Sequence, residues 1–223
     1  MIVSIVSRLI IKVLLKRKKK QLLSKAIVAK NQDELFCKRA STITLVDGST
    51  PNDIIIGNKV WMWGRLNSQS GGKISIGNNT QIGYGCAINA VESVSIGNYV
   101  MFGPYVTIDD NNNHPVSPAF RKYMRIMGDV DSSRWKHSAH APVVVGDNCW
   151  IGRNVSIMKG VTIGENCVIA ANSVVTKSIP ANCIVAGNPA KVVKTNIDTI
   201  PAPKSCEGYN EFVKQQTENG ATK

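Results

Sequence analysis

The sequence lacks the patterns that mark several classes of protein. None of its six cysteines belongs to a Cys-x-x-Cys pair, so the usual spacing of a zinc or dithiol site is missing, and reduced thiols in a cytoplasmic protein are expected. The N-terminal apolar stretch is too short to cross a bilayer and is interrupted by Arg8 and Lys12. No aromatic residues are interleaved with the basic run Lys16 to Lys20, which argues against binding of nucleic acid.

Positive charge is concentrated at one end of the chain. Lys and Arg number 27 against 15 Asp and Glu, a formal net charge of +12, and residues 1–40 hold eleven of the basic residues against Asp33 and Glu34. No small-residue cleavage site of a signal peptide is visible. We expect residues 1–40 to form a basic amphipathic helical segment. It either makes peripheral contact with the inner face of the cytoplasmic membrane through residues 1–20 or packs on the open end of the fold or on a neighbouring subunit.

Aliphatic residues recur at every sixth position in two blocks of the chain. The downstream block contains Val145, Ile151, Ile157, Ile163, Ile169 and Val175. Upstream the same interval separates Ile76, Ile82 and Ile88, and again separates Ile96, the aromatic Phe102 and Ile108. A period of six fits neither a helix nor a half-buried strand, and a short internal repeat predicts a solenoid. Three units, each a short strand and a tight turn, close a triangular coil of about eighteen residues. An antiparallel sandwich would not keep one phase over six consecutive units.

A second set of positions supports the same geometry. Two places before each aliphatic residue stands a small or β-branched residue, such as Cys149, Val155 or Cys167. These residues are expected to fill the second inward site of a narrow tube, where cysteine acts as a compact hydrophobe. Gly, Asn and Asp, as in the run Gly146 to Asn148, supply the turns where φ is positive.

Four segments carry a resemblance to a known family. They are Cys149 to Gly152, Lys159 to Gly164, Asn172 to Pro180 and Ala186 to Lys191. They resemble hexapeptide-repeat acyltransferases of the sugar O-acetyltransferase branch, which includes galactoside and maltose acetyltransferases, and the likeness covers roughly residues 54–194. It implies an all-β fold, a left-handed parallel β-helix, with acetyl-CoA as co-substrate, no metal, and a homotrimer with active sites between subunits. We expect a β-helix domain at 41–194 and a C-terminal tail at 195–223.

The repeat is interrupted where all three histidines lie. It stops at Ile108 and resumes at Val143, which predicts a long extruded loop at 109–142. Acetyl transfer to a hydroxyl needs a base, and neutral imidazole suits that task near pH 7. His114, followed by Pro115, resembles the catalytic histidine of galactoside and maltose acetyltransferases and is the expected general base.

Other residues of the loop leave alternatives open. Asp109 or Asp110 is a candidate to orient the ring of His114. His140 is the alternative base, although packing on the resumed coil is its expected role, and His137 has no special spacing. The spacing of the three histidines makes a metal site a weak hypothesis.

The resemblance also implies the residues that hold the acyl donor. Carried over position by position, they are Trp150, Arg153, Ala171, Thr176, Lys177, Lys191 and Lys194. Arg153 and Ala171 would lie beside the pantetheine arm and Thr176 and Lys177 near the nucleotide. Lysines at 191 and 194 stand where the galactoside enzyme has arginines, so a point charge would replace a bidentate phosphate contact. Each lysine is alternatively a solvated surface charge, and Trp150 walls the thioester tunnel or fills a corner.

The sequence says least about which acceptor molecule receives the acetyl group. The loop carries Phe120, Arg121, Tyr123 and Trp135, which suit sugar rings and an acidic or phosphorylated carrier. With the basic N-terminus, they favour acetylation of a glycan hydroxyl during capsule or O-antigen assembly. Two alternatives are an acetyltransferase of antibiotics or other small molecules, and a non-catalytic β-helix scaffold.

Overall fold

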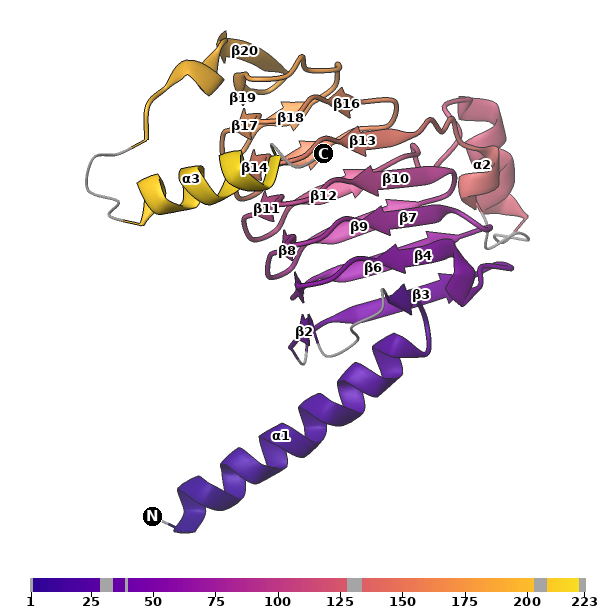
Figure 1. Cartoon of the computed structure of the whole chain (residues 1–223). Coiled ribbons are helices and arrows are strands. Elements are labelled where there is room, and N and C mark those ends of the chain that lie inside the picture. Colours follow the sequence, from indigo (N-terminus) through magenta and orange to yellow (C-terminus); the bar gives the residue numbers. More distant parts are fainter. Residues whose placement is uncertain (1, 29–33, 39, 128–133, 203–207, 221–223) are drawn as a thin grey trace.

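Three sheets of parallel strands wrap around one axis and form a left-handed parallel β-solenoid (Figure 1). The computed structural model describes residues 2–28, 34–38, 40–127, 134–202 and 208–220. Sheet A contains β1 (Ile27–Val28), β4 (Ile54–Ile56), β7 (Lys73–Ile76), β10 (Ser93–Ile96), β13 (Val143–Val145) and β16 (Thr162–Ile163). Sheet B contains β2 (Leu35–Cys37), β5 (Val60–Met62), β8 (Gln81–Ile82), β11 (Met101–Phe102), β14 (Trp150–Ile151), β17 (Val168–Ile169), β19 (Ile184–Gly187) and β20 (Ala190–Lys194). Sheet C contains β3 (Thr42–Val46), β6 (Arg65–Gln69), β9 (Ala87–Ala90), β12 (Thr107–Asp109), β15 (Ser156–Ile157) and β18 (Val174–Val175).

The strands follow one another around the tube in the order A, B, C. We number the successive turns as coils, so that coil 1 is β1 to β3, coil 2 is β4 to β6, and coil 6 is β16 to β18. All pairings inside the tube are parallel, and only β20 pairs antiparallel, with β19, among the described strands. The all-β solenoid predicted from the six-residue period is confirmed.

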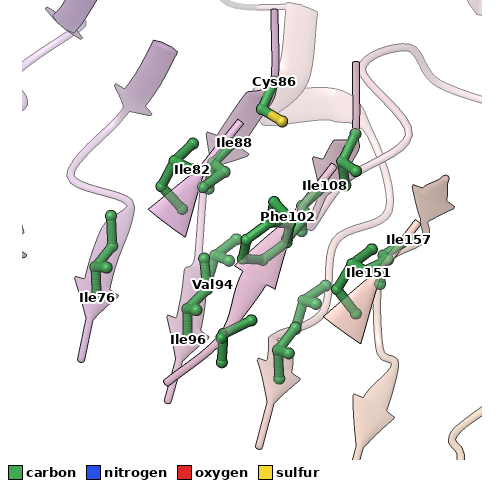
Figure 2. Close-up of a cluster of buried hydrophobic side chains, with 14 of the residues drawn as sticks. Ile76, Ile82, Cys86, Ile88, Val94, Ile96, Phe102, Ile108, Ile151 and Ile157 are labelled. Carbon is green, nitrogen blue, oxygen red and sulfur yellow. The ribbon is translucent and has the colours of Figure 1, made fainter. Parts of the chain in front are cut away.

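The inward positions of the repeat stack into the core. Figure 2 shows Ile88, Ile108 and Ile157 as one such column, and these side chains are at most 1% exposed. Burial of an isoleucine side chain contributes about 1.5–3 kcal/mol, so the repeated column is the main source of stability. The predicted small inward sites at Cys86, Cys149 and Cys167 are also buried, and burial raises the pKa of the Cys86 thiol to about 11.

Asparagines at the corner between sheets A and B hold adjacent coils together. Asn148, Asn166 and Asn182 have φ values of 54°, 57° and 61°, a left-handed conformation that asparagine tolerates. Their side chains form a ladder, because Nδ2 of Asn148 donates to Oδ1 of Asn166 at 2.9 Å and Nδ2 of Asn166 donates to Oδ1 of Asn182 at 2.9 Å. The turn residues therefore fix the backbone and also bridge the coils.

The upstream coils are longer than the predicted eighteen residues. Ile76 pairs with Ile96, twenty residues later, whereas Val145 pairs with Ile163, eighteen residues later. The predicted spacing of eighteen holds from coil 5 to coil 6 but not in coil 3, because the corner between sheets C and A needs two more residues there. After coil 6 the spacing falls to sixteen, since Ile163 pairs with Ile179.

One helix lies at the first end of the tube, one on the extruded loop, and one follows the last coil along the chain (Figure 1). They are α1 (Ile2–Leu23), α2 (Pro118–Ile126) and α3 (Tyr209–Gly220), with short 3-10 turns η2 (Pro51–Asp53), η3 (Arg134–His137) and η4 (Ile197–Thr199). The last turn of α1 covers the open end of coil 1, where Leu22 is 1% exposed, and the rest of the helix projects away. None of the described helices is long and apolar enough to span a membrane.

The division of the chain at residues 40 and 194 stays a prediction. The helix ends at Leu23, and β1 and β2, which lie before residue 41, already pair with β4 and β5. Within 109–142, α2 and η3 occupy part of the predicted loop. The predicted tail contains η4 and α3, while its residues 203–207 and 221–223 lie outside the described residues.

Candidate active site

The extruded loop leaves the tube between β12 and β13 and is closed at its base. The backbone N–H of Ala141 donates to the carbonyl of Asp110 at 2.8 Å, and the N–H of Asn112 donates to the carbonyl of Ala139 at 3.0 Å. Asn111 and His140 form an isolated antiparallel bridge. The residues on either side of His114 are therefore anchored to the tube, although the loop is long.

The buried side chain of Asp110 holds the start of the loop in place. Its carboxylate is buried and accepts hydrogen bonds from the N–H groups of Val91 (2.9 and 3.0 Å) and Glu92 (2.7 Å) and from Nδ2 of Asn111 (3.0 Å). Backbone N–H donors of this kind compensate a buried carboxylate. Neither Asp110 nor Asp109 hydrogen-bonds to the imidazole of His114 within the described residues, so the structure gives the orienting hypothesis no support.

Asp109 belongs instead to a polar ladder on the outer face of sheet C. Nδ2 of Asn67 donates to Oδ1 of Asn89 at 2.6 Å, and Nδ2 of Asn89 donates to Oδ1 of Asp109 at 2.7 Å. Burial raises the pKa of the Asp109 carboxyl above its ordinary value. The hydrogen bond from Asn89 and the charge of Arg65 oppose that rise, and the charge of Asp110 adds to it. The ladder presents amide and carboxylate groups at fixed positions.

A small polar cavity lies over this ladder, next to the base of the loop. Its volume is about 190 Å³, and its lining residues are Gln69, Asn89, Asp109, Asn111, Asn113 and Trp135. Trp135 comes from the loop, and its indole Nε1 donates to Oγ of Ser70 at 2.8 Å. Ser70 in turn donates to the carboxylate of Asp47. The cavity therefore combines a floor of hydrogen-bonding groups with one aromatic side chain held from coils 1 and 2.

His114 directly follows Asn113, which lines this cavity. Its side chain is exposed, its N–H donates to the carbonyl of Asn112 at 2.7 Å, and its imidazole makes no hydrogen bond to another described residue. Nη1 of Arg121 on α2 donates to the carbonyl of Pro115 at 3.2 Å and also to the carbonyl of Val116. Arg121 thus holds the backbone just after His114, whereas the sequence suggested that Arg121 contacts an acidic carrier.

The other two histidines have structural partners. Nδ1 of His140 lies 2.7 Å from Oε2 of Glu92, and the ring of His137 lies edge-on to Phe120 with centroids 5.3 Å apart. In the described parts of the chain, no three residues among His, Cys, Asp and Glu are arranged to hold a metal ion.

The predicted donor residues lie on the outer surface of the last coils. Trp150 is 55% exposed on β14 of sheet B, while Lys191 and Lys194 lie on β20 at the end of the same sheet. Arg153 and Ala171 occupy successive coils at the corner between sheets B and C, where the N–H of Asn172 donates to the carbonyl of Arg153 at 2.9 Å. Thr176 and Lys177 follow β18. The cavity beside His114 is lined by none of these residues, so their role stays a prediction.

The polar ladder below the cavity was missed by sequence reasoning, although Asp109 itself was a candidate to orient His114. Asn67, Asn89 and Asp109 each directly follow an inward aliphatic residue of sheet C, namely Leu66, Ile88 and Ile108. Polar residues at one repeat position in three successive coils predict a ladder on the outer face, because the position after an inward residue points outward. Gln69 and Ser70 carry no such signal.

Comparison with known proteins adds independent information. The family model of the bacterial transferase hexapeptide (six repeats) matches residues 142–177. The polysialic acid O-acetyltransferase of Escherichia coli O1:K1 / APEC is 34% identical over 161 residues, 68% of this chain and 48% of that protein. The galactoside O-acetyltransferase of Escherichia coli (strain K12) is 36% identical over 139 residues, 62% of each chain.

Two more proteins are similar to this chain. The putative colanic acid biosynthesis acetyltransferase WcaF of Escherichia coli (strain K12) is 32% identical over 128 residues, 56% of this chain and 70% of that protein. A point mutant of AntD, an N-acyltransferase from Bacillus cereus solved with dTDP and coenzyme A, is similar in fold, with a TM-score of 0.62 and 21% identity over 88% of this chain and 96% of that one. The chain thus spans 48% and 62% of the first two relatives and 70% of the third.

Proposed function

Because the chain belongs to the hexapeptide-repeat acetyltransferase family, we propose that it transfers an acetyl group from acetyl-CoA to a hydroxyl group of a sugar. One observation carries the proposal. A polar cavity lined by Asn89, Asp109 and Trp135 is also lined by the residue that precedes His114, whose side chain is exposed. The names of the three relatives include polysialic acid, galactosides and colanic acid. The structure of AntD contains coenzyme A.

In this proposal His114 is the general base. Its imidazole takes the proton of the acceptor hydroxyl while the hydroxyl oxygen attacks the thioester carbonyl and forms the new C–O bond. The C–S bond then breaks, and the CoA thiolate receives the proton from the imidazolium. The exposed position of His114 suits this role, because both the acceptor and the thioester must reach one ring nitrogen.

The polar cavity would hold the acceptor sugar. Amide and carboxylate groups of Asn89 and Asp109 are suited to sugar hydroxyls, and an indole suits the apolar face of a sugar ring. The hydrogen bond from Trp135 to Ser70 limits the rotation of the indole, so the aromatic surface is preorganised. The side-chain entropy of the indole is therefore lost during folding, and its loss does not reduce the free energy of ligand binding.

The donor would bind along the last coils. Arg153 and Ala171 would contact the pantetheine arm, Thr176 and Lys177 the nucleotide, and Lys191 and Lys194 the phosphates. These side chains lie away from the cavity beside His114, which supports an active site shared between two subunits. In that arrangement His114 of one protomer would meet the donor held by its partner.

We also propose that the protein is a homotrimer. The outer face of sheet B carries apolar side chains in register: Phe36 pairs with Trp61, and Met101 pairs with Trp150. Phe36, Met101 and Trp150 are exposed, and the rings of Phe36 and Trp61 stack with centroids 5.2 Å apart. Exposed apolar patches of this kind mark an interaction surface. Sedimentation is expected to give a trimer, and a fully active monomer would contradict the proposal.

We further propose that the enzyme works at the inner face of the cytoplasmic membrane in surface polysaccharide assembly, as capsule or O-antigen. The α1 helix projects from the tube, and Ile10, Ile11 and Val13 on it are about half exposed. The basic run Lys16 to Lys20 follows them. Anionic lipid attracts such residues by about 1 kcal/mol each.

A vesicle assay tests the membrane contact. The full chain is expected to sediment with phosphatidylglycerol vesicles and to stay in solution with phosphatidylcholine vesicles. Replacement of the five basic residues of the run by glutamine is expected to abolish sedimentation. Equal sedimentation of both proteins would show that the run makes no lipid contact.

A thiol-release assay tests the activity. Acetyl-CoA is supplied with free sugars, nucleotide sugars, lipid-linked sugars and a panel of aminoglycosides, and products are identified by mass spectrometry. We expect CoA release that depends on a sugar acceptor and a product heavier by one acetyl group on oxygen. Turnover with the antibiotics alone would favour the small-molecule alternative, and no turnover with any acceptor would favour the scaffold.

A further inference from the structure

A second cavity lies at the corner between sheets B and C, away from His114. Its volume is about 460 Å³, and its lining residues are Ala40, Thr42, Trp63, Gly64, Arg65, Tyr84, Gly85, Cys86 and Tyr105. They come from coils 1 to 4 and include none of the residues expected to hold the donor or to act as base. None of the groups assigned above to the transfer step therefore lies in this cavity.

A shortened corner in coil 2 explains why this hollow exists. Met62 and Leu66, the inward residues on either side of the corner, pair with Ile82 and Ile88 of the next coil. Residues 63–65 thus turn the corner in coil 2, whereas the longer segment 83–87 turns it in coil 3. The shorter corner lies closer to the tube axis and leaves a step beneath the wider corners that follow.

Aromatic side chains form the walls of this step. Tyr84 and Tyr105 are 56% and 55% exposed, and their rings meet edge-on with centroids 5.6 Å apart. Gly85, at φ 69°, lies against the Tyr105 ring, where a Cβ atom would come within 2.5 Å of it. The glycine lets the tyrosine fold against the corner. Together with Trp63, the two tyrosines present a broad aromatic surface to solvent.

The cavity is also positively charged. The guanidinium of Arg65 makes no hydrogen bond or ion pair with another described residue, and Nζ of Lys38 lies 4.6 Å from the centre of the Trp63 ring. No acidic residue lines the cavity within the described part of the chain. A ligand that fits it must offer an anionic group to Arg65 and a flat apolar face to the aromatic rings.

One strand connects this cavity to the acceptor cavity. On β6 the side chains of Arg65, Asn67 and Gln69 alternate with inward residues and share the outer face of sheet C. Arg65 lines the second cavity and Gln69 lines the first. Four residue steps along a strand span roughly 13 Å. A ligand that occupies both cavities must therefore span at least this distance, which a chain of several sugar units can do.

We propose that the second cavity binds an anionic sugar unit of a longer acceptor glycan, at a distance from the sugar that is acetylated. The proposal rests on the proposed function, because it assigns the acceptor to the outer face of sheet C. The guanidinium of Arg65 would pair with a carboxylate or phosphate of that unit, and Tyr84, Tyr105 and Trp63 would contact the C–H face of its ring. The enzyme would thus prefer an acidic polymer over a free sugar.

Calorimetric binding without acetyl-CoA tests this subsite separately from catalysis. The probes are a tetramer of galacturonic acid, its fully methyl-esterified neutral counterpart and a phosphorylated oligomannose. We expect the wild-type full chain to bind at least one anionic probe about tenfold more tightly than the neutral tetramer, since a hydrogen bond to a charged group is stronger than one to a neutral group. The two anionic probes distinguish a carboxylate from a phosphate as the preferred group.

Matched variants localise the effect. Arg65→Gln is expected to remove the preference for the anionic probe, and Tyr84→Ala to weaken the affinity for it severalfold. Lys59→Gln, which removes one positive charge from the same coil at the corner between sheets A and B, is expected to leave it unchanged. Equal affinity for charged and neutral tetramers would overturn the proposal. So would an unchanged preference in Arg65→Gln, or a shift in oligomeric state on Tyr84→Ala, which would show that another protomer covers the cavity.

The outcome also separates the subsite from the proposed activity. Binding that depends on Arg65, in a protein that acetylates no acceptor, would sustain the subsite and refute the enzyme. Acetylation of acidic and neutral acceptors with equal efficiency, and without dependence on Arg65, would sustain the enzyme and refute the subsite.

Discussion

The first four coils and the last two coils share one stacked core but differ in how regular their strands and corners are. Coils 5 and 6 pair with each other at a constant spacing of eighteen residues in all three sheets, with strands of two or three residues and an asparagine ladder at one corner. The earlier coils have strands of up to five residues in sheet C, a shortened corner and an extruded loop. Both cavities described above lie in these irregular coils. Regular repeats build the tube, and departures from the repeat build the surfaces that can recognise a ligand.

The largest effect is expected at the loop that separates the two regions. His114→Ala should lower the rate of acetyl transfer by about 100- to 10,000-fold, because a positioned base contributes that much. Thiol release at saturating acetyl-CoA measures it. His140→Gln is the matched control, since it removes an imidazole bound to Glu92 and should change the rate by less than about fivefold. Comparable loss in both variants would count against His114 as the base.

Truncation of the core should affect the two regions alike. Ile88→Ala in coil 3 and Ile157→Ala in coil 5 should each lower the free energy of unfolding by about 2–5 kcal/mol, since both side chains are fully buried in one column. Denaturant titration measures the change. Thr162→Ala, on an exposed position of coil 6, should cost less than about 0.5 kcal/mol. A cost confined to coil 5 would mean that the irregular coils contribute little to stability.

Substrate affinities should divide between the regions. Asn89→Ala breaks the polar ladder and should raise KM for the acceptor about tenfold, since two hydrogen bonds are lost, while KM for acetyl-CoA stays constant. Lys177→Ala should raise KM for acetyl-CoA by about fivefold at most, as expected of an exposed charge, and leave the acceptor unaffected. Steady-state kinetics with each substrate varied in turn tests this division. Parallel changes in both constants would remove the distinction between the acceptor and donor coils.

The smallest effect is expected on thermal stability, from the carboxylate charge of Asp109 in the polar ladder. Burial raises the pKa of Asp109, so its ionisation destabilises the fold as the pH rises from the ordinary aspartate pKa through the raised value. Asp109→Asn keeps the acceptor oxygen for Asn89 and removes that penalty. The variant should therefore melt at a higher temperature than the wild type at pH 7, and the difference should shrink at acidic pH. A difference that is independent of pH would contradict this assignment.

The sequence was sufficient for the tube and for the place of the loop. Residues such as Ile151 and Ile157 occur in strict phase because each must point into a narrow interior, so periodicity alone predicts them. The break between Ile108 and Val143 likewise predicted where the chain leaves the tube. The extra residues of the upstream coils were not anticipated, because a longer corner leaves the phase of the inward residues within each coil intact.

The candidate site was only partly accessible to sequence reasoning. His114 and Trp135 were named from their motif and their loop, but the contacts of Trp135 with Ser70 and of Asp110 with Val91 join residues far apart in the chain. Such contacts depend on how the loop folds back over the tube, which no local pattern encodes. The donor residues carried over from the resemblance remain predictions, because they lie outside the cavity beside His114.

The two ends of the tube bear on how the molecule avoids polymerising. A stack of parallel strands ends in unpaired N–H and C=O groups, which would accept a further coil from another molecule. Leu22 of α1 closes the first coil, and β20 reverses direction against β19 while carrying Lys191 and Lys194 on the last edge of sheet B. A reversed, charged edge strand and a helical plug make poor templates for continued growth. Both features therefore disfavour end-to-end growth of the repeat into a fibre.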